Sequence, residues 1–157
     1  MIDGVIIKDL KVIKDERGGL FEILRSDSEG FLPFGQAYIT IASVGIVKAW
    51  HYHKNQTDRW IVVKGIARVM LVDTRHKSPT DGEYIDQNFS EHNPQLLIIP
   101  ERVIHGFENI SNNSDCWIMN IPDKLFNYKK PDEYRLPFND PCIINKIAKA
   151  WYNQKGG

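Results

Sequence analysis

Two histidines separated by one residue are the feature that most constrains this chain. His51 and His53 lie in a run rich in β-branched and aromatic residues, so a strand there points both imidazole rings to one face. Gly45 and Gly65 bracket the run, and an acidic residue, Asp58, follows the second histidine. Several titratable side chains gathered on one strand face indicate a small-molecule site.

A second histidine segment, Pro100–Asn109, completes this pattern downstream. The two segments together resemble the two signature motifs of a cupin barrel. The matching positions are Gly45, His51, His53, Gly65, Pro100, His105 and Asn109. Asp58 takes the acidic position of the first motif, while Arg102 replaces a glycine of the second. The resemblance implies an all-β cupin, or jelly-roll, barrel.

The bulk composition limits the function classes. A length of 157 residues and 42% hydrophobic content predict one globular domain, residues 1–157. Twenty basic and 20 acidic residues cancel, which argues against nucleic-acid and membrane-surface partners. The chain has two cysteines, no CxxC pair and no recognisable secretory signal, so we expect free thiols and a cytoplasmic location.

Short strand-like runs separated by turn signals predict a sandwich or barrel. The runs are Val5–Ile13, Gly19–Leu24, Gln36–Val44, Ile46–His53, Arg59–Lys64, Ala67–Thr74, Tyr84–Phe89, Gln95–Ile99, His105–Ile110 and Cys116–Pro122. Ser26–Phe31 is long enough for one helical turn, and a helical apolar stripe over Ile143–Tyr152 predicts a short C-terminal helix. Pro131, Pro137 and Pro141 make the preceding stretch an extended surface segment.

Further motifs extend the resemblance to one family, from about residue 3 to residue 141. They are Asp15-Glu16-Arg17-Gly18 with Phe21-Glu22, Gln36, His51, Val69–Arg75 with Ser78–Gly82, Ile99–Phe107, Tyr128 with Pro131, and Asn139-Asp140-Pro141. In order and spacing these are similar to the dTDP-4-dehydrorhamnose 3,5-epimerase family, the sugar-nucleotide epimerases of rhamnose synthesis.

This resemblance implies enolate chemistry on a nucleotide-linked 4-keto-6-deoxyhexose, without a cofactor or a metal. A histidine base removes a proton beside the ketone, a cation steadies the enolate oxygen, and a tyrosine returns a proton to the opposite face. The implied catalytic residues are His51 as base, Asp58, His105 and Tyr128. The implied substrate-binding residues are Arg17, Glu22, Gln36, Lys48, His53, Arg59 and Asn120. The family also implies a homodimer in which the Arg17 loop reaches the partner's site.

The chain departs from the family at three positions. Asp58 falls where the family has its enolate-stabilising lysine, and Lys48 stands in place of an arginine. No tyrosine occupies the acid position, close to Asn120. Three alternatives stay open. Arg59, Lys48 or a metal held by Asp58 and the histidines supplies the cation, the enzyme inverts one carbon or shifts the ketone, or Tyr128 or Tyr52 acts as acid.

Two rival functions follow from the same residues. His51, His53, Asp58 and His105 form a plausible ligand set for a divalent metal such as Zn, Fe, Mn or Ni. The chain would then be a metal-dependent cupin enzyme acting on another small, sugar-like substrate. A metal-bound histidine cannot also be a free base, so the two interpretations exclude each other. The third possibility is a sugar-binding cupin without catalysis.

Overall fold

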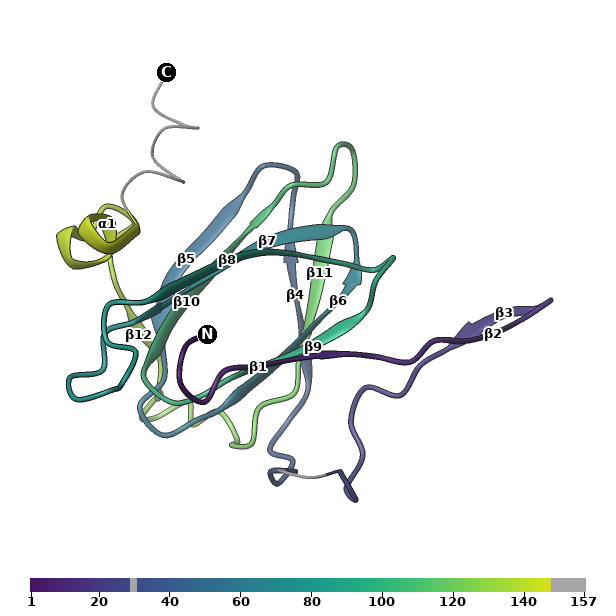
Figure 1. Ribbon diagram of the computed structural model, residues 1–157, viewed down its shortest axis with the longest axis horizontal. Coiled ribbons are helices and arrows are strands. Elements are labelled where there is room, and N and C mark those ends of the chain that lie inside the picture. The colour runs from purple at the N-terminus through teal and green to yellow at the C-terminus, as the bar shows by residue number, and fades with distance from the viewer. Residues whose placement is uncertain (29–30, 148–157) are drawn as a thin grey trace.

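Two five-stranded antiparallel sheets face each other in the computed structural model, which describes residues 1–28 and 31–147 (Figure 1). One sheet has the order β1-β9-β6-β11-β4 and the other the order β12-β5-β10-β7-β8. The strands are β1 Ile6–Asp9, β2 Ile13–Asp15, β3 Gly18–Leu20, β4 Tyr38–Ala42, β5 Val47–Tyr52, β6 Asp58–Lys64, β7 Ile66–Asp73, β8 Tyr84–Ser90, β9 Gln95–Ile99, β10 Val103–Asn109, β11 Cys116–Asn120 and β12 Tyr134–Arg135. The predicted all-β jelly-roll fold is confirmed.

The main core lies between the two sheets. Trp60 and Val62 of β6 meet Val69 and Leu71 of β7 and Phe107 of β10 in one buried cluster. Each pair is two residues apart because alternate side chains of a strand point to the same face. Burying these large apolar side chains is the main stabilisation that the fold has available.

Strand boundaries differ from the prediction where pairing partners run out. The predicted strand Val5–Ile13 divides into β1 and β2, because the β1–β9 ladder stops at Pro94, which has no N–H to extend it. The predicted strand Gly19–Leu24 is shorter in the structure. Strand β3 ends at Leu20, because Leu20 pairs with Ile13, the first residue of β2. Strand β12 was not predicted, because it forms only through pairing with β5, distant in sequence.

A short helix, α1 (Pro141–Ile147), follows the barrel. Its N-terminus is capped by Asp140, whose Oδ1 accepts a hydrogen bond from the Cys142 N–H at 2.9 Å, and proline takes the first helical position. The predicted helix Ile143–Tyr152 therefore begins two residues early, and its residues from 148 onward lie outside the described part of the chain. Ser26–Phe31 forms hydrogen-bonded turns in its described residues.

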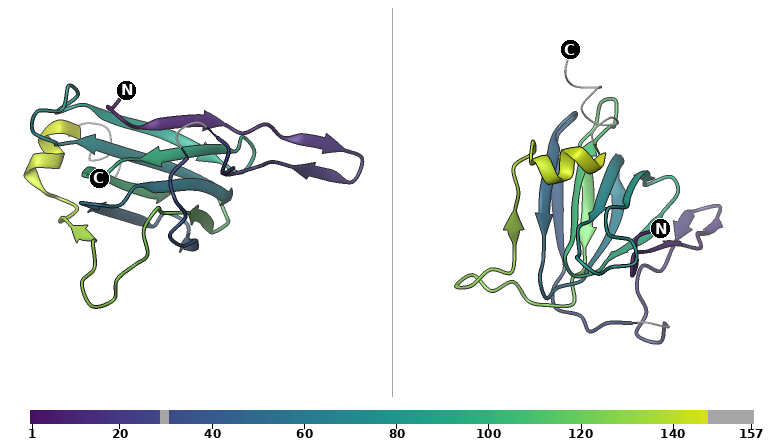
Figure 2. Two further views of the ribbon diagram at one scale, coloured as in Figure 1. Left: turned by 90° about the horizontal axis from the view of Figure 1, so that it is seen from below. Right: turned by 60° about the vertical axis from the view of Figure 1, so that its left-hand side comes forward.

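The β2–β3 hairpin projects away from the barrel (Figures 1 and 2, purple). Arg17 in its turn pairs with Asp15, and both side chains are exposed. In the described part of the chain, no helix is long and apolar enough to cross a membrane.

The Asp-x-Arg and Ser-Pro-Thr motif closes the loop between β7 and β8. Asp73, fully buried, accepts hydrogen bonds from Arg75 Nε at 2.9 Å, Ser78 Oγ at 2.6 Å and Thr80 Oγ1 at 2.7 Å. Arg75 also donates to the carbonyl of Asp3 at 2.7 Å, which ties the N-terminal segment to the loop. Burial alone raises the pKa of Asp73, but these donors outweigh it and hold the pKa below its usual value.

We expect Asp73→Asn to lower the free energy of unfolding at pH 7 by about 1–3 kcal/mol, because the amide leaves buried donors unpaired. A depressed carboxyl pKa contributes stability above the unfolded-state pKa of about 4, and that contribution disappears as the pH falls below it. Urea unfolding should therefore show a smaller difference between variant and wild type at pH 3 than at pH 7. Asp15→Asn on the exposed hairpin is the control and should change little at either pH. An equal effect of both substitutions would contradict the structural role of Asp73.

Candidate active site

A cavity of about 820 Å³ lies between the two sheets. Side chains of β4, β6 and β11 border it from one sheet, and side chains of β5 and β10 border it from the other. The segment that holds Phe126 and Tyr128, and the segment with Glu133 and Arg135, complete its lining. Its size suits a small organic ligand, and its walls combine aromatic and polar groups.

His51 and His53 both border this cavity. His51 lies opposite His105 in the β5–β10 ladder, and their ring centroids are 4.0 Å apart. The register between these strands shifts between His105 and Phe107, where β5 carries one residue more than β10. This bulge allows Lys48 and His51, three residues apart, to border the same cavity.

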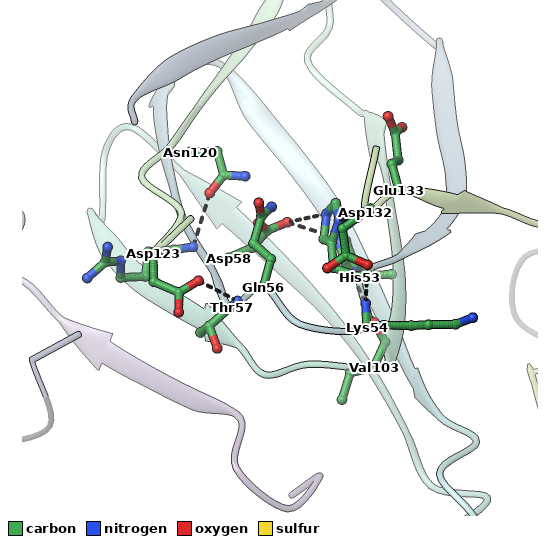
Figure 3. Close-up of polar contacts among 12 residues, drawn as sticks. His53, Lys54, Gln56, Thr57, Asp58, Val103, Asn120, Asp123, Asp132 and Glu133 are labelled. Atoms are coloured by element: carbon green, nitrogen blue, oxygen red, sulfur yellow. Dashed lines mark hydrogen bonds and ion pairs between the residues drawn. The ribbon is translucent and has the colours of Figure 1, made fainter. Parts of the chain in front are cut away.

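Asp58 joins His53 and His105 into one buried cluster. Figure 3 shows Asp58 beside His53. Its Oδ2 lies 3.2 Å from His53 Nε2 and 3.3 Å from His105 Nε2, and its Oδ1 accepts a hydrogen bond from Gln56 Nε2 at 2.8 Å. The Asp58 residue is only 1% exposed. Since Asp58 and His105 are not among the lining residues, they stand behind the histidines that face the cavity.

The backbone holds the other ring nitrogens of this cluster. His53 Nδ1 contacts the carbonyl oxygen of Asp132, and His105 Nδ1 lies 2.9 Å from the carbonyl oxygen of Val103. The Asp132 carboxylate in turn accepts the backbone N–H groups of Lys54, labelled in Figure 3, and of Asn55 at 3.0 and 2.8 Å. Each of the two rings thus faces an oxygen at both of its nitrogens.

The pKa values in this cluster are shifted in different directions. Burial lowers the pKa of His53, but Asp58 and the Asp132 carbonyl outweigh this and raise it. Burial raises the pKa of Asp58, but His105 and His53 outweigh this and bring it well below its usual value. The pKa of His51 lies well below its usual value because of burial and the neighbouring His105. His51 is therefore neutral near pH 7 and free to accept a proton.

Four predicted substrate-binding or catalytic residues border the cavity besides the histidines: Gln36, Lys48, Asn120 and Tyr128. Gln36 Oε1 accepts a hydrogen bond from the backbone N–H of Phe126 at 3.3 Å. Tyr128 is 89% exposed, and its ring meets Phe126 at a centroid distance of 5.0 Å, so both aromatic rings stand at the mouth.

Three predicted contacts lie elsewhere. Arg59 is 1% exposed, and its guanidinium donates to the carbonyl oxygens of residues 32, 33 and 121. Arg59 and Asp58 are adjacent on β6, so their side chains point to opposite faces of the sheet. The Arg59 guanidinium therefore stabilises the backbone and does not reach the cavity. Arg17 lies on the projecting hairpin and Glu22 pairs with Arg25, so neither lines the cavity of its own chain.

Tyr38 and Arg135 are two of the lining residues that were not predicted. Tyr38 on β4 lies two residues after Gln36 and two before Thr40, and all three border the cavity. The period of two along a strand was a sequence signal for Tyr38 once Gln36 had been assigned to the site. Arg135 lies opposite His51 in the β12–β5 ladder, and the proline-rich sequence around it carried no comparable signal.

The predicted metal ligands also meet the spacing that a metal requires. His51, His53, Asp58 and His105 each offer a ligand atom, and these atoms lie within 4.8 Å of one another. Three of these atoms are buried: His53 Nε2, Asp58 Oδ2 and His105 Nε2. The carboxylate oxygen lies within ion-pair distance of both nitrogens, yet none of the three atoms has a well-aligned hydrogen bond. Three imidazoles and a carboxylate therefore fit a divalent transition metal as well as they fit a metal-free ion-pair cluster.

A barrel of two facing antiparallel sheets, with a histidine-lined cavity between them, is a cupin-type barrel with a small-molecule site. The family model for dTDP-4-dehydrorhamnose 3,5-epimerase matches residues 1–155. The chain belongs to this family of carbohydrate epimerases, which confirms the resemblance seen in its motifs.

Individual relatives agree with this assignment. The chain is 38% identical over 143 residues to the spore coat polysaccharide biosynthesis protein SpsL of Bacillus subtilis, covering 91% of this chain and 94% of the relative. It is 37% identical over 140 residues to a probable low-salt glycan biosynthesis epimerase, Agl13, of Haloferax volcanii, covering 88% and 89%. Among solved structures, a dTDP sugar isomerase of Desulfovibrio desulfuricans superposes with a TM-score of 0.84 at 31% identity, covering 95% and 94% of the two chains.

We expect Asp58→Asn to destabilise the protein by about 3–5 kcal/mol near pH 5.5, because it removes one partner of a buried ion pair. The Asp58 contribution is present above the unfolded carboxyl pKa of about 4 and is lost in acid. The His53 contribution is present below the unfolded imidazole pKa of about 6.5 and is lost as the pH rises through the higher folded value.

The difference in unfolding free energy between wild type and variant should therefore be largest between these two limits. Chemical unfolding from pH 3 to pH 9 measures it. Asp86→Asn, which breaks the surface pair with Arg68, is the control and should give a smaller effect. An Asp58→Asn effect independent of pH would contradict the ion-pair description of the cluster.

Proposed function

We propose that the chain epimerises or isomerises a nucleotide-linked 4-keto-6-deoxyhexose through an enolate intermediate. The observation that carries this proposal is the neutral His51 imidazole on the cavity wall, backed by the buried cluster of His53, Asp58 and His105. Family membership supports the reaction class. The names of the two bacterial and archaeal relatives support a role in making a surface polysaccharide or glycan.

The chemistry begins at the ketone. A C4 carbonyl acidifies the protons on the neighbouring carbons, and His51 takes one of them as a general base. Negative charge then develops on the carbonyl oxygen and must be stabilised. Lys48 and Arg135 border the cavity and carry the positive charges for this task or for the diphosphate. The Asp58 carboxylate does not oppose the step, because it is buried behind His53 and its charge is matched there.

The remaining lining groups suit a nucleotide sugar. Phe126 and Tyr128 at the mouth offer aromatic faces for a nucleobase. Gln36 and Asn120 border the same cavity and offer polar contacts to sugar hydroxyls. Together with the two cations, these groups match the apolar, anionic and polyhydroxyl parts of the proposed substrate.

We propose that the reaction uses no cofactor, since enolate formation and reprotonation involve no net oxidation. The second candidate is a metal-dependent enzyme, favoured by the spacing of His51, His53, Asp58 and His105. A bound divalent metal would act as a Lewis acid that polarises the substrate carbonyl. His51 would then be a ligand, so the two candidates differ in what this side chain does.

We expect His51→Asn to abolish the exchange of solvent deuterium into dTDP-4-keto-6-deoxyglucose, while binding of dTDP changes less than about threefold. Proton NMR of the metal-stripped protein in heavy water measures the exchange, and calorimetry measures the binding. His92→Asn is the matched control, because His92 is exposed on the turn between β8 and β9 and should leave exchange unchanged.

Other outcomes assign the rival functions. If the wild type exchanges deuterium only after a divalent metal is added, His51 is a metal ligand and the metal-dependent function is supported. Binding of the nucleotide sugar by the wild type without exchange under either condition would indicate a binding protein. Unchanged exchange in His51→Asn would exclude this residue as the base.

We also propose that the chain is a homodimer. Ile39 and Ile41 on the edge strand β4 are 43% and 47% exposed. An apolar sheet face of this kind is a common interface. The projecting hairpin leaves Arg17 free of its own cavity, which suits a contact with a partner's bound nucleotide.

Light scattering after size exclusion should give twice the chain mass of 18.1 kDa. Ile41→Glu should shift the protein towards the monomer, because it buries a charge in the proposed interface. Lys8→Glu, on β1 outside the apolar pair, serves as the control for an added acidic side chain. A monomeric wild type at micromolar concentration would contradict the proposal.

A further inference from the structure

The proposed mechanism needs a group that returns a proton to the carbon, and the cavity holds a tyrosine suited to this step. Tyr38 lies on β4, in the sheet that faces the one carrying His51. Both side chains border the same cavity. A sugar ring held between the sheets would therefore present one face towards His51 and the other towards Tyr38.

Asn120 fixes the Tyr38 hydroxyl in position. The two residues are direct partners in the β4–β11 ladder, and Asn120 Nδ2 donates to Tyr38 Oη at 2.8 Å. The orientation of this amide is determined on its other side, because Asn120 Oδ1 accepts the backbone N–H of Arg59 at 3.1 Å. Since Asn120 occupies a lone pair of the phenol oxygen, the phenol proton remains available for another acceptor.

The electrostatic surroundings keep this phenol protonated. The Tyr38 residue is 41% exposed, but partial burial of its hydroxyl and the negative charge of Asp58 raise its pKa to about 12, although the hydrogen bond from Asn120 acts in the opposite direction. At neutral pH the side chain is thus a neutral acid that gives up its proton only to a strong base. An enolate carbon is such a base.

The other tyrosines considered from the sequence are less suitable. Tyr128 is 89% exposed at the mouth, where water competes for its hydroxyl. Tyr52 stacks on Tyr134 with ring centroids 5.1 Å apart and is not among the cavity-lining residues. Tyr38 alone among these three combines a cavity position with a hydroxyl held by a neighbouring side chain.

We propose that Tyr38 is the catalytic acid that returns a proton to the enolate on the face opposite His51, and that Asn120 is its positioning residue. This inference rests on the proposed function. His51 takes the proton from the carbon, and the C–H electron pair forms the enolate. The enolate carbon then takes the Tyr38 proton, the carbonyl is restored, and a tyrosinate is left. The tyrosinate regains a proton from solvent, and His51 releases one, so the net change is inversion alone.

The test separates proton removal from inversion. The wild type, Tyr38→Phe and Asn120→Ala are incubated with dTDP-4-keto-6-deoxyglucose in heavy water, and proton NMR follows deuterium in recovered substrate and in the epimer. Tyr38→Phe should still exchange deuterium into the substrate with retention, because His51 removes and returns the proton on its own face. Formation of the epimer should fall by at least about 100-fold. Tyr84→Phe, on the exposed edge strand β8, is the matched control and should behave as wild type.

Each result decides for or against the role of Tyr38. Retained exchange shows that the variant is folded and that its base works, so a selective loss of inversion supports the proposal. Asn120→Ala should also lower the ratio of inversion to exchange, by a smaller factor, and an unchanged ratio would overturn its positioning role. Wild-type inversion in Tyr38→Phe, or loss of both exchange and inversion in a variant with wild-type thermal stability, would overturn the acid role. A wild type without exchange would overturn the proposed function itself.

Discussion

The candidate site depends on one buried carboxylate. Asp58 is out of reach of water, and its Oδ2 stands between the Nε2 atoms of His53 and His105. A carboxylate that is buried and ionised needs such partners, because desolvation without them would cost several kcal/mol. These contacts fix both rings, and the His105 ring in turn packs against His51. Burial and the neighbouring His105 hold the pKa of His51 well below its usual value, although Asp58 acts in the opposite direction.

The proposed reaction also requires access to both faces of the substrate, and the two facing sheets provide it. Strands β4 and β5 are consecutive in the chain but belong to different sheets, so residues close in sequence come to line opposite walls. His51 is carried by one of these strands and Tyr38 by the other. A reaction that removes a proton on one face and returns it on the other requires this separation. The resemblance implies that Asp58 falls at the family's lysine position, and Lys48 and Arg135 are the basic residues that border the cavity.

Much of the fold and part of the site could be predicted from the sequence, because local pattern decided them. The His-x-His spacing on a strand brought two rings to one side, and the downstream motif brought His105 to the same cluster. Asp58 and Arg59 are adjacent at the start of β6, so strand alternation turns their side chains to opposite faces, and this difference was readable from the sequence. Arg135 could not be predicted, because its position comes from the pairing of a two-residue strand with β5, far away in sequence. Tyr38 was missed because the family's acid position falls near Asn120, where the chain has no tyrosine, and Tyr38 comes to lie beside Asn120 only through the β4–β11 pairing.

The most direct test of this account is the protonation state of the histidines. Nitrogen-15 NMR of the metal-stripped protein, labelled at the imidazole nitrogens and assigned with His51→Asn and His53→Asn variants, reports it for each ring. We expect His53 to carry protons on both nitrogens at pH 7 and His51 to be neutral with one free nitrogen. A neutral His53 beside Asp58, or a His51 that is already protonated at pH 7, would contradict the central claim that the buried carboxylate keeps His53 charged while burial keeps His51 neutral.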